Sequence, residues 1–417
     1  MRSQENTVSL AVSESKHNRR NFIGGLWHGA FLALGVSLTQ PTTVISAFVA
    51  DLTGSTVWVG GLSTVLTVAG ALPQPFVARW IEPRPRKMPY LLVAIYLRVI
   101  SWAMLAWLVY AIGDQQPVVL AWILVGMLVI FYIGGGLGSI PYTDIIGKII
   151  APDRRGAFFG GKGALAGPLS VSAAFSARYI LAHVPYPNNY ALLFGLAATG
   201  LAIAALGFWV IREPSASETK RNNRTWLEYW RQLLDASRRL KTLIAVQLLT
   251  GFSLMALPFY VVYAREQLGA PPDSIGWFLL AQILGGVLSN LVWARLVDRS
   301  GSRWMLFCCA VISTLTPLSA VLLSPLGWVA LLPVFFLAGA AFNGRQVGFQ
   351  SALLELAPVT ERATYAGLNA VLILPVAFLP LAAGYFLQRW SYSALFLFVA
   401  FFIGIGAILV RRWLARD

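Results

Sequence analysis

The sequence predicts an all-α polytopic membrane protein with twelve transmembrane helices in two pseudo-symmetric six-helix bundles. Its 417 residues are 57% hydrophobic and only 12% charged, which is far more apolar than a soluble domain requires. Apolar runs long enough to cross about 30 Å of hydrocarbon, which takes roughly 20 helical residues, recur from one end to the other. These runs are continuous rather than alternating, so helices are favoured over a β-barrel.

The predicted spans divide evenly around one long polar connection. The first six lie at residues 22–48, 56–78, 88–112, 117–141, 158–182 and 189–211, and the second six lie at 242–264, 273–296, 304–323, 327–353, 364–387 and 392–412. We therefore expect a tail at 1–21, an N-terminal bundle at 22–211, a linker at 212–241, a C-terminal bundle at 242–412 and a second tail at 413–417. The first tail has no apolar core or small-residue cleavage pattern, so no removable signal peptide is predicted.

The formal charge of +15 is interpreted as a topology signal. Most Lys and Arg residues lie in the termini and in the loops after spans two, four, six, eight and ten, whereas the opposite loops hold Arg265 and Arg389. Positive residues mark the cytoplasmic side of short loops. We expect both termini to be cytoplasmic, the bilayer to be a bacterial cytoplasmic (inner) membrane, and nucleic acid not to be a partner.

The linker contains a predicted amphipathic helix. Apolar residues at helical spacing stand beside arginines there: Trp226, Leu227, Trp230, Leu233 and Leu234, with Arg231, Arg238 and Arg239. This pattern is typical of a helix that lies on the membrane surface. Docking of a partner is the alternative interpretation.

The two halves repeat a charged element. "ARWIEPRPRK" begins at Ala78 and "ARLVDRSGSR" begins at Ala294, a shift of 216 positions that also aligns Gly60 with Gly276. Such repeats favour a parallel duplication, in which two bundles rock around a central site and expose it alternately to each side.

These motifs resemble those of the major facilitator superfamily of transporters, whose loop motif reads roughly G-x-L-A-D-R-x-G-R-K. The second copy keeps Asp298, Arg299, Gly301 and Arg303, whereas Pro83 and Pro85 interrupt the first. The resemblance implies a gate latch at the cytoplasmic face. The predicted latch residues are Arg79, Glu82, Arg86, Lys87, Asp144, Arg155, Arg295, Asp298, Arg299, Arg303, Glu355 and Arg362. The alternative is that these charges only enforce topology and solvate the loops.

Ionisable groups within a span are costly and indicate function by default. Arg345 lies near the middle of span ten, with Asn343, Gln346 and Gln350 at helical spacing, and the resemblance implies that this span lines the cavity. An arginine there can hold a carboxylate or phosphate. The alternative is an arginine that ties helices together through backbone carbonyls.

Further polar groups complete the predicted substrate site: Gln247, Thr250, Tyr260, His28 and Lys162. His28 is also the candidate proton carrier, although a packing role is the alternative. Arg98, in span three, is expected to support the bundle rather than to bind substrate.

The sequence shows no enzyme, cofactor or metal-binding pattern. Cys308 and Cys309 are adjacent, which argues against a disulfide framework or a four-ligand metal site. We expect a monomeric transporter, secondary active or facilitative, that moves a small organic solute, anionic or amphipathic, by alternating access, with a proton or sodium as a possible coupling ion. Efflux is favoured, because "GALAGP" (163–168) resembles the core of the antiporter motif of drug exporters. The alternative is a non-transporting sensor or assembly factor with the same fold.

Overall fold

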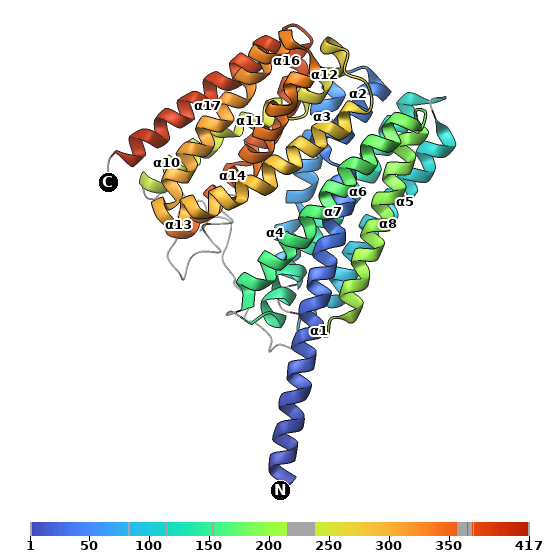
Figure 1. Cartoon of the computed structure of the whole chain (residues 1–417), viewed down its shortest axis with the longest axis vertical. Helices are drawn as coiled ribbons and strands as arrows, with labels where there is room; N and C mark the ends of the chain where they lie inside the picture. Colours follow the sequence, from blue (N-terminus) through green and yellow to red (C-terminus); the bar gives the residue numbers. More distant parts are fainter. Residues whose placement is uncertain are drawn as a thin grey trace. The chain divides into compact units, whose positions relative to one another are not determined.

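The computed structural model describes residues 2–81, 84–113, 115–151, 154–214, 238–356, 365, 369 and 371–415. Every regular element in these ranges is helical, and they contain no strand (Figure 1). Nine helical segments in them are long and apolar enough to span a membrane, and Thr56–Ala71 and Leu374–Leu387 are shorter apolar helices. The predicted all-α membrane fold is therefore confirmed, and the segments are consistent with twelve spans. Glu82, Arg362 and the amphipathic helix at 226–234 lie outside the described residues.

The chain divides by its internal contacts into two compact units. Unit 1 comprises Met1–Thr39 and Leu66–Asn222, and unit 2 comprises Gln40–Val65 and Asn223–Asp417. The later part of the first predicted span and the beginning of the second thus belong to unit 2.

Unit 1 is built from long helices that pack closely. They are α1 (Arg2–Leu38), α4 (Pro73–Ile81), α5 (Met88–Ile112), α6 (Pro117–Ile149), α7 (Arg155–His183) and α8 (Asn188–Val210). Helix α1 packs against α7 and α8, and α5 packs against α6 and α8. A Cβ on Gly207 would lie 2.4 Å from the carbonyl oxygen of Gly24, so only small residues allow α1 and α8 to approach this closely.

Unit 2 contains the remaining helices. They are α2 (Ser46–Thr53), most of α3 (Thr56–Ala71), α10 (Arg238–Gly251), α11 (Ser253–Ala256), α12 (Phe259–Leu268), α13 (Ser274–Leu323), α14 (Leu332–Leu356), α16 (Leu379–Leu387) and α17 (Tyr392–Leu414). Helix α13 covers two predicted spans and kinks at Gly301, whose φ of 81° favours glycine. Helices α13 and α14 lie side by side (Figure 1).

The first predicted span is interrupted near its end. Helix α1 ends at Leu38, and a π-helical turn, Pro41–Ile45, leads into α2. Proline lacks a backbone N–H, so a continuous α-helical ladder cannot pass through Pro41. Helix α1 also begins at Arg2, so it extends through most of the expected polar tail.

Candidate functional site

A cavity of about 160 Å³ lies within unit 1, among α1, α5, α6 and α7. Its polar groups come from His28, Arg98, Ser139, Tyr142 and Lys162. The remaining lining residues are small or apolar: Leu32, Leu91, Ala94, Ile95, Gly134, Gly135 and Gly138. This lining contains two basic side chains, Arg98 and Lys162, and no carboxylate.

Arg98 reaches this cavity from α5. The buried Nε of its guanidinium has no hydrogen-bond partner among the described residues, and the guanidinium carbon lies 4.4 Å from the centre of the Phe131 ring. A Cβ on Gly134 would lie 3.0 Å from Cγ of Arg98, so the glycine leaves room for this side chain. The aromatic face stabilises the charge, but a guanidinium carries five N–H donors that a ring does not satisfy.

Lys162 and His28 face the cavity from α7 and α1. The Lys162 ammonium donates to the Tyr142 hydroxyl at 3.1 Å, and a Cβ on Gly29 would collide with the lysine stem. Nδ1 of His28 lies 3.0 Å from the carbonyl oxygen of Ala204, so this nitrogen carries the proton that it donates. The structure thus brings two predicted substrate residues, His28 and Lys162, to the same cavity as Arg98.

The polar residues predicted at the substrate site in span ten, which is α14, lie in two different environments. Arg345 donates to the Thr250 hydroxyl and, at 3.4 Å, to the Gln247 carbonyl oxygen, which ties α14 to α10. Gln346 and Gln350 are exposed instead, and Asn343 is partly buried. The arginine therefore has the helix-tying geometry, while the two glutamines lie on an exposed face of α14.

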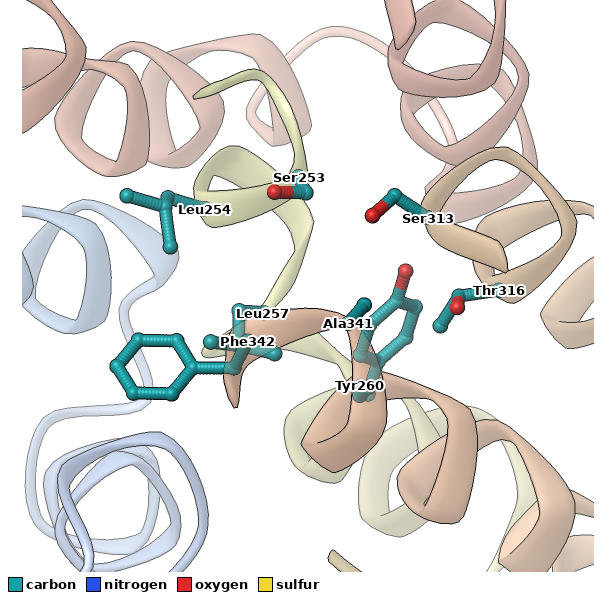
Figure 2. Close-up of a pocket in the computed structure, with 9 residues that line it drawn as sticks. Ser253, Leu254, Leu257, Tyr260, Ser313, Thr316, Ala341 and Phe342 are labelled. Atoms are coloured by element: carbon teal, nitrogen blue, oxygen red, sulfur yellow. The ribbon is translucent and has the colours of Figure 1, made fainter. Parts of the chain in front are cut away.

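A second, smaller cavity lies within unit 2. It has a volume of about 20 Å³, and Figure 2 shows the Tyr260 hydroxyl on the side that carries Ser313 and Thr316. Such a volume holds about one water molecule rather than an organic solute. The buried Ser313 side chain borders this space, so a water here would accept a hydrogen bond from its hydroxyl or donate one to it.

The first copy of the charged motif joins a network of four charged side chains in unit 1. Asp144 pairs with Lys87 at 2.9 Å and with Lys148 at 2.6 Å, and Lys148 pairs with Glu213 at 3.2 Å. The Glu213 carboxylate also accepts from the backbone N–H groups of Lys87 and Met88. Two cations and two anions therefore hold the start of α5, the end of α6 and the segment after α8 together.

The other predicted latch residues of the first half stand apart from this network. Arg86 and Arg155 are exposed, and Arg155 donates to the Gly147 carbonyl oxygen at 3.3 Å. The side chain of Arg79 lies outside the described part of the structure. Of the first set, the structure thus brings together Lys87 and Asp144.

The second copy of the motif makes different contacts. Glu355 accepts from the Ser302 hydroxyl at 2.6 Å, and the Arg303 guanidinium lies 4.9 Å from the Trp413 ring centre. Asp298 and Arg299 are exposed, and so is Arg295, whose guanidinium donates to the Leu291 carbonyl oxygen at 3.5 Å. Ser302 and Arg303 therefore anchor the turn, while the acidic residue of the motif faces outward.

Residues 40–65 make a separate set of polar contacts with the rest of unit 2. Asp51 forms an ion pair with Arg265. Gln282 donates to the Thr42 hydroxyl at 2.9 Å, and Thr56 donates to the Gly384 carbonyl oxygen at 2.9 Å. These contacts join the segment to α12, α13 and α16.

Sequence reasoning missed several members of these clusters, including the charged residues Lys148, Glu213 and Asp51. Lys148 stands four residues after Asp144, a spacing that favours a helical ion pair. Glu213 and Asp51 lie near predicted span ends and showed no pattern of their own, because their partners are distant in sequence. In the described part of the chain, no group of three or more His, Cys, Asp or Glu is placed to hold a metal ion.

Comparison with known proteins agrees with the fold. The sequence model of the Major Facilitator Superfamily matches residues 243–417. No curated protein matches the chain. The predicted resemblance to this superfamily is confirmed by this match together with the structures to which the chain is similar.

Several solved membrane transporters share the fold over almost the whole chain. A nucleoside transporter, NupG, is similar with a TM-score of 0.73 and 13% identity, over 93% of this chain and 98% of that one. A bacterial homologue of the iron transporter ferroportin, in an inward-facing state, is similar with a TM-score of 0.69 and 16% identity, over 96% and 99%. A peptide transporter of the POT family is similar with a TM-score of 0.70 and 11% identity, over 95% and 97%.

Proposed function

We propose that this chain, which has the fold of the Major Facilitator Superfamily and matches its sequence model over residues 243–417, is a membrane transporter of a small organic solute. The transporter is secondary active or facilitative and works by alternating access. The solute is anionic or amphipathic, because the embedded charges are cationic. The family match and the shared fold support the transporter class.

The observation that carries the proposal is the exposed polar face of α14. Gln346 and Gln350 are exposed one helical turn apart, in line with exposed Phe342. Gln346 lies ten residues before the end of α14, or about 15 Å along the axis, which is deep within a span. An amide that faces hydrocarbon is costly, so this face is expected to line a water-filled path.

The direction and the energy source belong to the same proposal. Efflux is favoured by the "GALAGP" motif, which lies on α7 with Pro168 inside the helix. A proton or a sodium ion is the proposed coupling ion, and His28 is the proposed proton carrier. The placement of Lys and Arg supports cytoplasmic termini in a bacterial inner membrane.

Counterflow tests this function directly. The full chain is reconstituted into liposomes, and a radiolabelled solute that raises the unfolding temperature of the purified protein is supplied outside. Accumulation driven by unlabelled solute inside is the expected result. Binding without any counterflow would contradict transport and would favour the sensor or assembly role.

A further inference from the structure

We propose that the unit 1 cavity binds the carboxylate or phosphate group of a small soluble anion between Arg98 and Lys162. The proposal rests on the transport function proposed above and names the chemistry that its substrate presents to unit 1. It also changes the expected role of Arg98 from support of the bundle to contact with the solute.

The first argument is the unpartnered Nε of the Arg98 guanidinium. Its Nε is buried without a hydrogen-bond partner among the described residues, and the guanidinium lies against the face of the Phe131 ring. An unpaired buried donor is costly, and a guanidinium is more costly than a neutral group. A carboxylate or phosphate is the ligand that matches its planar fork of donors.

The second argument is the charge of the whole lining. Lys162 adds a second cation. Its ammonium donates a hydrogen bond to the Tyr142 hydroxyl, which is neutral and does not balance its charge. No Asp or Glu lines the cavity. Two cations that share a cavity of low dielectric repel each other, and a bound anion removes this repulsion.

The third argument is shape. Gly134, Gly135 and Gly138, all on α6, form one wall of the cavity. A Cβ on Gly135 would lie 4.0 Å from the unpartnered Nε of Arg98, so the glycine leaves space beside this donor. A volume of about 160 Å³ is close to that of an engineered cavity of about 150 Å³ that holds benzene, so a phosphate or a small carboxylate fits. Drug-sized ligands need roughly 300 Å³ or more, so only a small anion or the acidic end of a larger one enters.

Binding is measured on the purified full chain in a non-ionic detergent at neutral pH. Inorganic phosphate and acetate are titrated at constant ionic strength, and the unfolding temperature is followed. At least one of them is expected to raise it saturably. Arg98→Met and Lys162→Met are each expected to weaken this binding at least tenfold, because each removes one charged donor and keeps an unbranched apolar stem.

Two further variants separate binding from folding. Gly135→Val keeps both charges but fills the space beside Arg98, and it is expected to lower the affinity as well. Arg178→Gln removes one cation from an exposed position on α7 and is expected to bind like the natural protein. Wild-type affinity in folded Arg98→Met and Gly135→Val, or no saturable response to either anion, would overturn the proposal.

The source of the anion is distinguished in nanodiscs. Stabilisation by phosphatidylglycerol relative to phosphatidylcholine, without any response to the free anions, would identify a lipid headgroup and overturn the soluble ligand. The transport proposal fails separately: counterflow that persists in Arg98→Met and Lys162→Met would reject this site alone, whereas intact binding with no counterflow would reject transport alone.

Discussion

The carboxylate of Glu213 accepts a hydrogen bond of 2.8 Å from the backbone N–H of Met88, at the first residue of α5. A helix N-terminus carries unsatisfied N–H groups and a partial positive charge, so a carboxylate stabilises it. The Glu213 side chain is only 4% exposed and also pairs with Lys148. One residue therefore caps α5 and balances the charge of a lysine on α6.

Glu213→Ala is expected to lower the stability of the chain by about 1 to 3 kcal/mol, because two backbone donors and one lysine lose their acceptor. The measurement is thermal unfolding in detergent. Asp298→Asn is the matched control, since it also removes one carboxylate near a charged motif but from an exposed position, and it is expected to change stability by less than about 0.5 kcal/mol. Equal effects of the two variants would argue against the capping role.

Arg345 and Thr250 are expected to act as one unit. Arg345→Met and Thr250→Val each break the hydrogen bond between these two side chains, so the double variant should cost less than the sum of the two. A coupling free energy of about 0.5 to 3 kcal/mol is expected from a double-mutant cycle of unfolding. Additive losses would show that the arginine does not depend on this tie and would favour a direct role with the solute.

Gln346→Leu and Gln350→Leu are expected to reduce transport at least several-fold without lowering the unfolding temperature, because both amides are exposed. Counterflow and thermal unfolding are measured on the same preparations. Leu322→Ile, at a residue that is 74% exposed, is the control for a change on an outer surface. Unchanged transport in both glutamine variants would remove the observation that carries the proposed function.

Asp51→Asn is expected to loosen residues 46–53 from the rest of unit 2, because it removes the ion pair with Arg265. Both side chains are partly exposed, so the loss of stability is about 0 to 1 kcal/mol. Amide hydrogen exchange in α2 should become faster. The double variant Asp51→Arg with Arg265→Asp, which swaps the two charges, should restore part of the protection of these amides against exchange. Unaltered exchange in the single variant would contradict the anchoring role.

The proposed latch predicts different effects for the two motif copies. Asp144→Asn breaks two ion pairs and is expected to alter the accessibility of cysteines introduced along α14, as measured by labelling. Asp298→Asn is expected to produce a shift only if Asp298 gains a partner in another conformation, because it is exposed in this one. If neither variant changes labelling, these charges serve topology alone.

The fold was predictable because hydrophobic length alone specifies a membrane helix. Arg345 and Thr250 were both expected at the substrate site, but their mutual bond was not, because a sequence does not show whether an arginine finds its acceptor in the protein or in a ligand. The role proposed for Arg98 could not be read from the sequence for the same reason. Its buried Nε lies beside glycines of α6, which carry no chemical signal, in a cavity whose described lining holds no carboxylate.

The break at Pro41 has a mechanical consequence. The backbone passes from unit 1 into unit 2 between Thr39 and Gln40, next to a proline, and returns between Val65 and Leu66 inside α3. Any shift between the units therefore requires the backbone to change conformation at or near these two crossings.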